Sequence, residues 1–170
     1  MKTQEFDVVV LGSGVAGSLT AMILHRVGQR VALIEKSRHP RFAIGESSTP
    51  IANMVLRDLA IRYDLPRLLP LTKYGSWQEV YPQIGCGLKR GFSYFAHEAG
   101  RAFTPSPTHE NELLVAASID DHSSDTQWLR ADVDQFFCRE ADMVGVTVLE
   151  DCAVREIRHD GVGDWLIGCR

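Results

Sequence analysis

A glycine-rich turn near the start of the chain constrains its fold more than any other feature. The sequence GSGVAG at positions 12–17 directly follows the apolar run 6–11, which is typical of a buried parallel strand. A stretch with apolar residues at helical spacing comes next, and Gly28 is placed to end that helix. A second apolar strand at 31–34 completes the unit. The order strand, turn, helix, strand predicts an α/β fold with a parallel sheet.

The three glycines of this turn have the spacing of a dinucleotide-binding motif. Gly12 lets the chain turn sharply out of the strand, and Gly14 lets a pyrophosphate approach the backbone. Gly17 lets the helix pack closely on the strand, and the helix N-terminus offers its N–H groups to the phosphates. Glu35 follows Gly17 by 18 residues, where a carboxylate binds a ribose 2′-OH and disfavours the 2′-phosphate of NADP. We therefore expect a cofactor that contains ADP, either FAD or NAD, and a tight turn without a ligand is the less favoured alternative.

Length, charge and cysteine content narrow the choice of protein class. With 170 residues the chain is long enough for one domain. Its net charge of −4 argues against a nucleic-acid-binding module, which normally carries a basic stripe. The apolar run near the start is too short to span a membrane. The four cysteines lie far apart without a CxxC pair, which indicates a reduced, cytoplasmic setting.

The sequence does not predict a metal site. No two of the six histidines have the i, i+4 spacing, with a carboxylate between them, that helical zinc sites use. Each histidine is expected on the surface or in a loop. Asp120, Asp121 and Asp125 form an acidic group that a solvated loop explains better than a metal site.

The rest of the chain alternates helical and extended patterns. Thr49 followed by Pro50 predicts the start of a helix that continues to residue 63. Aromatic residues and glycines alternate with polar residues from 75 to 95, which predicts strands. The segment 104–125 is expected to be mostly loop, with a short strand at 113–117. The later elements predicted are a helix at 130–144 ended by Gly145, a strand at 146–149 and a hairpin at 153–167.

Two segments resemble a known family. The sequence PRFAIGESSTP at 40–50 resembles the segment after the second strand of flavin-dependent halogenases and related FAD-dependent aromatic monooxygenases, where a PRxxxGES stretch runs beside the flavin. The sequence WLRADVD at 128–134, with Gly145-Val146 at the end of the next helix, is similar to a later segment of that family. The resemblance covers nearly the whole chain. It implies a Rossmann-type FAD-binding domain with a parallel sheet plus an antiparallel strand layer, of which residues 1–170 are an incomplete N-terminal portion.

The resemblance implies FAD as the cofactor and assigns residues to it. The residues implied for the ADP half are Gly12, Gly14, Gly17, Glu35 and Lys36. The residues expected near the flavin or its phosphates are Arg41, Gly45, Glu46, Ser47 and Arg130.

The resemblance also implies an activity, in which reduced FAD and O₂ form a peroxyflavin that halogenates or hydroxylates a small organic substrate. In the halogenases a lysine hands on the oxidised halogen. Lys89, in the sequence GLKRGFSYF, is the candidate, and Lys73, in TKYG, is the rival. The alternative is that both lysines face solvent. A separate flavin reductase is the protein partner implied. The aromatic residues of 75–95 are compatible with a pocket for an aromatic substrate, although a strand packed on a core explains them better.

Two other functions stay open at this point. A flavin dehydrogenase or reductase that acts on a lipid-like double bond would use the same N-terminal motifs and need no lysine. A non-catalytic dinucleotide-binding fragment would bind its ligand without turnover.

Overall fold

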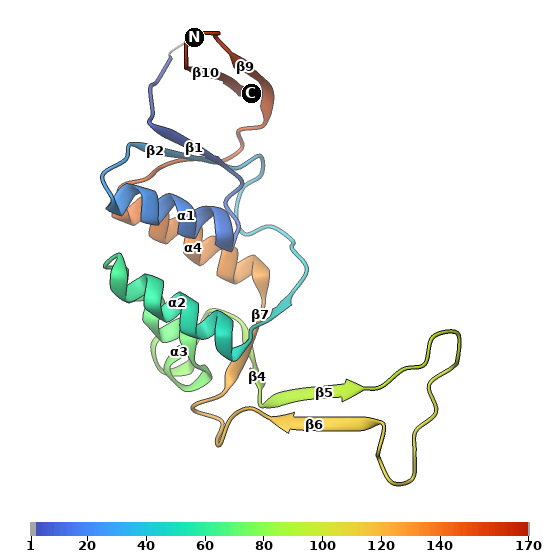
Figure 1. Cartoon of the computed structure of the whole chain (residues 1–170). Helices are drawn as coiled ribbons and strands as arrows, with labels where there is room; N and C mark the ends of the chain where they lie inside the picture. Colours follow the sequence, from blue (N-terminus) through green and yellow to red (C-terminus); the bar gives the residue numbers. More distant parts are fainter. Residues whose placement is uncertain (1–2, 170) are drawn as a thin grey trace.

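The computed structural model describes residues 3–169 of the chain (Figure 1). Within these residues, no helix has both the length and the apolar character needed to cross a membrane. The elements, in chain order, are β1 (Val8–Leu11), α1 (Val15–Arg26), β2 (Val31–Ile34), β3 (Glu46–Ser47), α2 (Pro50–Arg62), the 3-10 helix η1 (Pro66–Thr72), α3 (Tyr74–Val80), β4 (Cys86–Lys89), β5 (Gly91–Phe95), β6 (Glu112–Ala116), β7 (Asp125–Trp128), α4 (Arg130–Val144), β8 (Thr147–Leu149), β9 (Val154–His159) and β10 (Trp165–Cys169).

Three parallel strands carry the glycine-rich turn. Their order is β1-β2-β8, with Val9 opposite Ala32 and Leu33 opposite Val148. The helices α1 and α4 lie side by side and pack on these strands (Figure 1). β2 is buried along its whole length because it lies between two strands. The prediction of a buried first strand is wrong in degree, since β1 lies at the edge of the three strands and is only half-buried.

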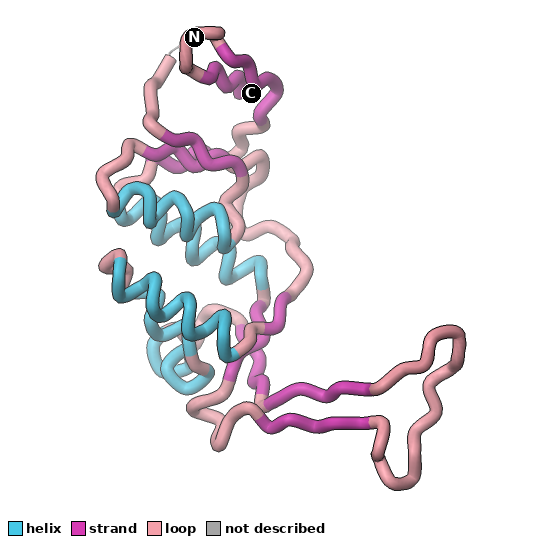
Figure 2. The backbone as a smooth tube through the Cα atoms, in the orientation of Figure 1, coloured by secondary structure: helices cyan, strands magenta, loops and turns pink. Residues whose placement is uncertain are grey.

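The antiparallel strand layer is confirmed. β3, β7 and β4 form one antiparallel sheet, in which Glu46 and Cys86 both lie opposite Trp128. β5 and β6 form a pair that projects from the body of the molecule, and β9 and β10 form another (Figure 2). The last pair is the hairpin predicted at 153–167, and β6 is the short strand predicted at 113–117.

Part of the segment 75–95 is helical, so the prediction of strands is wrong for α3. Trp77 is completely buried in this helix, and its Nε1 donates a 2.9 Å hydrogen bond to the carbonyl of Ile84. Tyr81 is buried four residues later and donates to the carbonyl of Arg67 at 3.0 Å. Two buried aromatic rings at i, i+4 suit one face of a helix, and the extended region begins only at Cys86.

The prediction that Asp120, Asp121 and Asp125 lie in a solvated loop is also only partly correct. Asp120 and Asp121 are exposed, but Asp125 opens β7 and is 2% exposed. The Nδ2 of Asn53 donates a 2.7 Å hydrogen bond to the Oδ1 of Asp125. A short strand paired on both sides therefore removes this carboxylate from water.

The helices that begin beside the cofactor motifs start as the sequence predicts. In α2, the Oγ1 of Thr49 accepts a 3.1 Å hydrogen bond from the N–H of Ala52, and Pro50 takes the first position. The helix α4 ends at Gly145, whose φ of 109° favours glycine.

Phe137 of α4 and Met22 of α1 are completely buried in one apolar cluster. Burial of each such side chain stabilises the fold by about 1.5–3 kcal/mol, and it fixes the start of α4 beside the glycine-rich turn.

Candidate cofactor-binding site

The glycine-rich turn joins β1 to α1 by a close contact that only glycine allows. Gly12 has a φ of 97°, and its N–H donates a 2.7 Å hydrogen bond to the carbonyl of Ile34. A Cβ at Gly17 would collide with the carbonyl oxygen of Gly12. The helix therefore presses directly on the turn, as the sequence motif requires.

Gly14 forms a cradle between two arginines. It is the N-cap of α1, and no side chain among residues 3–169 caps this helix end. A Cβ at Gly14 would lie 3.3 Å from Nη2 of Arg130, 3.7 Å from Oδ2 of Asp134 and 3.8 Å from Nη2 of Arg41. Uncapped N–H groups and two guanidinium groups at one point are suited to a pyrophosphate.

Glu35 is held by hydrogen bonds at the end of β2 and is 3% exposed. Its Oε2 accepts from both the N–H and the hydroxyl of Ser13 at 3.1 Å, and its Oε1 accepts from the N–H of Ser37 at 3.1 Å. Burial alone would raise the pKa of this carboxyl. The hydrogen bonds from Ser13 and Ser37 and the charge of Arg41 outweigh burial and hold the pKa below its ordinary value. Glu35 is therefore an ionised acceptor beside the turn.

Arg41 connects the two buried carboxylates of the site. Its Nη2 lies 3.3 Å from Oε2 of Glu35, and its Nη1 lies 3.6 Å from Oδ2 of Asp134, which is completely buried. The Nε of Arg41 is buried and has no hydrogen-bond partner among the described residues. Arg41 therefore has donor capacity left for a bound anion.

Arg130 fixes the start of α4 to the segment 40–50, which we call the GES segment after its residues Gly45, Glu46 and Ser47. It donates to Asp134 through Nε at 2.7 Å and Nη2 at 3.1 Å, and through Nη1 to Glu46. The hydrogen bonds to Asp134 raise the pKa of Arg130, with burial opposing them and the charges of Asp134 and Glu46 adding to them. The two segments 40–50 and 128–134 are joined as well by the pairing of β3 with β7. Residues that the sequence separates by more than 80 positions thus form one site.

Lys89 also contacts the GES segment. Its Nζ donates a 2.6 Å hydrogen bond to the carbonyl of Ser48 and lies 4.1 Å from the centre of the Phe92 ring. Lys73, the rival lysine, is exposed and immediately precedes α3 in the sequence. Of the two, only Lys89 is in contact with the GES segment in the described chain.

A cleft of about 830 Å³ opens at the carboxyl ends of β1 and β2. Open α/β sheets bind their ligands at these strand ends. The cleft brings together Gly12, Glu35, Lys36 and Arg41 with Cys152 of the segment before β9. Gly45, Glu46 and Ser47 lie outside it and are exposed. The uncapped helix end, the Gly14 cradle and the unpartnered Arg41 Nε all fit the ADP half of FAD.

Several residues of the site were not singled out by sequence analysis. Asp134 balances two arginines, and its i+4 spacing from Arg130 is a signal that could have revealed it. Ser13 and His39 had no signal, because their contact depends on the fold: the Nε2 of His39 lies 2.7 Å from the Ser13 hydroxyl. The expectation that every histidine is in a surface or loop position holds for His39, a loop residue that is nevertheless only 9% exposed. It is wrong for His25, which lies in α1 and is half-buried.

Comparison with protein families identifies the class of protein. Residues 7–169 match the family described as FAD dependent oxidoreductase. The chain belongs to this family. FAD is accordingly the cofactor of this family, and the choice between FAD and NAD that the glycine motif left open is resolved.

The chain has halogenases among its relatives. Monodechloroaminopyrrolnitrin halogenase PrnC of Pseudomonas fluorescens is 34% identical over 161 residues, which are 95% of this chain and 28% of that protein. Tetracycline 7-halogenase of Kitasatospora aureofaciens is 29% identical over 160 residues, 93% of this chain and 27% of that protein. The crystal structure of halogenase PltM in complex with phloroglucinol and FAD matches with a TM-score of 0.81 at 26% identity. The match covers 98% of this chain and 32% of the PltM chain. The resemblance to flavin-dependent halogenases and the expected fold are confirmed, and the chain spans 27–32% of the length of these proteins.

Proposed function

We propose that residues 1–170 form the N-terminal, FAD-binding portion of a flavin-dependent halogenase that acts on a small organic substrate. The observation that carries this proposal is the contact of Lys89 with Ser48, at the end of the GES segment. The relatives and structural neighbours named above are halogenases, which supports halogenation over a flavin dehydrogenase.

The ADP half of FAD would lie at the glycine-rich turn. The N–H groups at the start of α1 would bind the pyrophosphate beside Gly14, and Arg41 and Arg130 would supply positive charge. Glu35 would accept a hydrogen bond from the ribose 2′-OH. Because it is ionised and buried, it would also repel a 2′-phosphate.

The flavin half would lie along Gly45, Glu46 and Ser47. Bound FAD, once reduced, supplies the electrons with which O₂ is activated. Lys89 is held by the carbonyl of Ser48 and by the face of Phe92, so its ammonium group has a fixed position. We assign to Lys89 the transfer of the oxidised halogen to the substrate.

Partners and compartment belong to the same proposal. A separate flavin reductase would supply reduced FAD, and exposed aromatic residues of β5, such as Tyr94 and Phe95, favour an aromatic substrate. All four cysteines are free thiols, which suits a reduced, cytoplasmic setting.

The test compares Lys89→Met with Lys73→Met in the native polypeptide. Lys89→Met should abolish halide-dependent product while the protein retains FAD on desalting. Lys73→Met, a change of the same kind at an exposed position, should keep both properties. Full halogenation by Lys89→Met, or its loss in Lys73→Met alone, would overturn the assignment of Lys89.

A further inference from the structure

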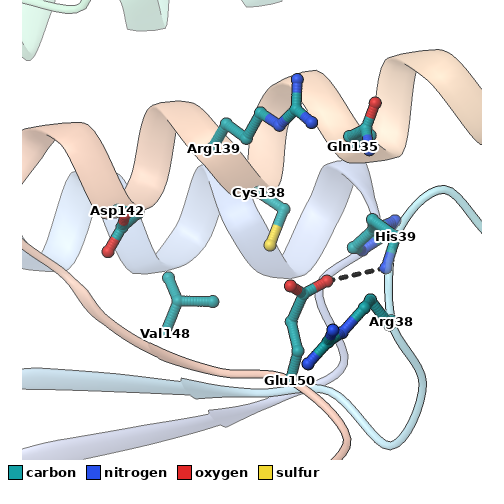
Figure 3. Close-up of a pocket in the computed structure, with 8 residues that line it drawn as sticks. All are labelled: Arg38, His39, Gln135, Cys138, Arg139, Asp142, Val148 and Glu150. Atoms are coloured by element: carbon teal, nitrogen blue, oxygen red, sulfur yellow. Dashed lines mark hydrogen bonds between the residues drawn. The ribbon is translucent and has the colours of Figure 1, made fainter.

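A second cavity lies between the loop after β2, the helix α4 and the end of β8 (Figure 3). Its volume is about 330 Å³. It is distinct from the cofactor cleft, since Gly12, Glu35 and Arg41 line only the latter. The residues of this cavity have no part in the proposed halogenation.

Three metal-binding side chains meet in this cavity. A ring nitrogen of His39, the Sγ of Cys138 and a carboxylate oxygen of Glu150 all lie within 4.8 Å of one another. They come from three separate elements, and Figure 3 shows Cys138 on α4 facing Glu150 and His39. His39 and Cys138 are 9% and 4% exposed, so two of the three groups are removed from water before any ligand binds.

Each of these side chains has unused bonding capacity. The Nδ1 of His39 is buried and has no hydrogen-bond partner among the described residues. Cys138 is a free thiol. The Oε1 of Glu150 accepts a 2.7 Å hydrogen bond from the N–H of His39, which orients the carboxylate and leaves Oε2 available. A buried histidine with one unsatisfied ring nitrogen beside a thiol requires an explanation that packing alone does not give.

The donor set selects a class of metal. Thiolate, imidazole and carboxylate together suit zinc and similar borderline transition metals rather than magnesium or calcium, which prefer oxygen. Ligand atoms bound to zinc at about 2.0–2.3 Å must stand somewhat closer together than in the metal-free chain. Glu150 is exposed, so its side chain is free to make that closure.

The charge around the cavity does not prevent a cation from binding. Arg38 and Arg139 line the cavity, but Asp142 and Glu150 line it as well. Arg38 is in addition neutralised by Asp151, at 3.0 Å. Ionisation of the Cys138 thiol would add a further negative charge when the metal binds.

We propose that His39, Cys138 and Glu150 form a binding site for a divalent transition-metal ion, with zinc as the expected occupant. Three protein ligands leave one position of a tetrahedral ion for water. The bond that forms is between the metal and the Cys138 sulfur, and the thiol proton leaves to solvent, so each bound ion releases one proton from Cys138. The bond from His39 Nε2 to the Ser13 hydroxyl places this site next to the cofactor turn.

Cobalt is the direct probe, because its spectrum reports both sulfur ligation and tetrahedral geometry. CoCl₂ added to the metal-free, flavin-free chain should bind at one equivalent. It should produce a near-ultraviolet sulfur-to-cobalt band and tetrahedral bands in the red, and ZnCl₂ should bleach both. Cys138→Ser should remove the sulfur band and weaken binding by about 100-fold or more, whereas Cys86→Ser should change neither.

Glu150→Gln is the second variant, because this exposed side chain can be changed with little risk to folding. It should weaken cobalt binding by at least about 10-fold and keep the sulfur band. The absence of saturable binding, or equal binding by the wild-type and Cys138→Ser chains, would overturn the proposal. Because the readout is made without flavin or substrate, it is independent of the proposed halogenation.

Discussion

The ammonium group of Lys89 donates a 2.6 Å hydrogen bond to the main-chain carbonyl of Ser48. Lys89 ends β4, while Ser48 follows β3, and β7 lies between these two strands. Ser48 is itself fixed to β7: its N–H donates to the carbonyl of Thr126 at 2.9 Å, and its hydroxyl accepts from the N–H of Thr126 at 3.0 Å. The position of the lysine is thus set by the central strand of the sheet.

Replacement of Thr126 tests this arrangement. Thr126 is completely buried, and its Oγ1 lies 3.2 Å from the Ser48 hydroxyl and accepts from Trp128 Nε1 at 2.8 Å. Thr126→Val keeps the shape but leaves the Nε1–H of Trp128 without its acceptor and removes one of the two hydrogen bonds of the Ser48 hydroxyl. The free energy of unfolding should fall by about 1–3 kcal/mol in urea titrations. Thr147→Val, at an exposed position in β8, should change it by less than about 0.5 kcal/mol.

The close contact of Gly17 with Gly12 predicts a large loss of stability in Gly17→Ala. The added Cβ would meet a backbone carbonyl that cannot move away, so the free energy of unfolding should fall by about 3 kcal/mol. Gly28→Ala is the matched comparison, because its Cβ would meet no atom within 4 Å and only the φ of 93° is unfavourable. That change should cost about 1 kcal/mol. Equal melting temperatures for the two variants would contradict the account of the turn.

The ion pair of Arg130 and Asp134 predicts that the loss of stability on replacing Arg130 depends on whether Asp134 is present. Asp134 is completely buried and receives two hydrogen bonds from Arg130. Arg130→Met should lower the free energy of unfolding by about 3 kcal/mol, because a buried carboxylate loses its main partner. Arg130→Met combined with Asp134→Leu should recover most of this loss in chemical denaturation. If the single and double variants are equally unstable, the burial of Asp134 does not explain the effect.

Glu35 predicts a dependence of stability on pH. Its folded-state pKa lies below the ordinary value of 4.5, so the carboxylate stabilises the fold above that pH. This contribution is lost as the pH falls through the folded-state pKa. Glu35→Gln should therefore be less stable than wild type by about 1–3 kcal/mol at neutral pH, and the difference should shrink in acid. Urea titrations at neutral and at acidic pH measure this difference in stability. Glu5→Gln, at an exposed position, should give no such difference.

The sequence predicted the elements around the cofactor motifs well because each has a local cause. The glycine spacing, the Thr49 cap and the glycine after α4 all act within a few residues. The helix α3 was mistaken for strand because a short aromatic segment fits either period, and the burial of Trp77 that decides it is a tertiary effect.

The candidate site was predictable only in part, for the same reason. Arg41, Glu46 and Arg130 were named from motifs, but the acid that joins two of them, Asp134, was not. The group of His39, Cys138 and Glu150 spans 111 positions of sequence and has no spacing signal, since the fold alone brings these residues together. Local patterns predict where a motif lies, and the packing of α4 against the sheet determines which charges surround it.

Flavin retention by the chain tests the central claim most directly. Wild-type protein mixed with FAD and desalted should keep the oxidised-flavin absorbance bands at about 370 and 450 nm. Gly14→Val should lose them, because its side chain would fill the cradle beside Arg130 and Arg41 where the pyrophosphate is expected. Both proteins should show the same far-ultraviolet circular dichroism. Colourless wild-type protein, or equal flavin retention by Gly14→Val, would contradict the placement of FAD at the glycine-rich turn.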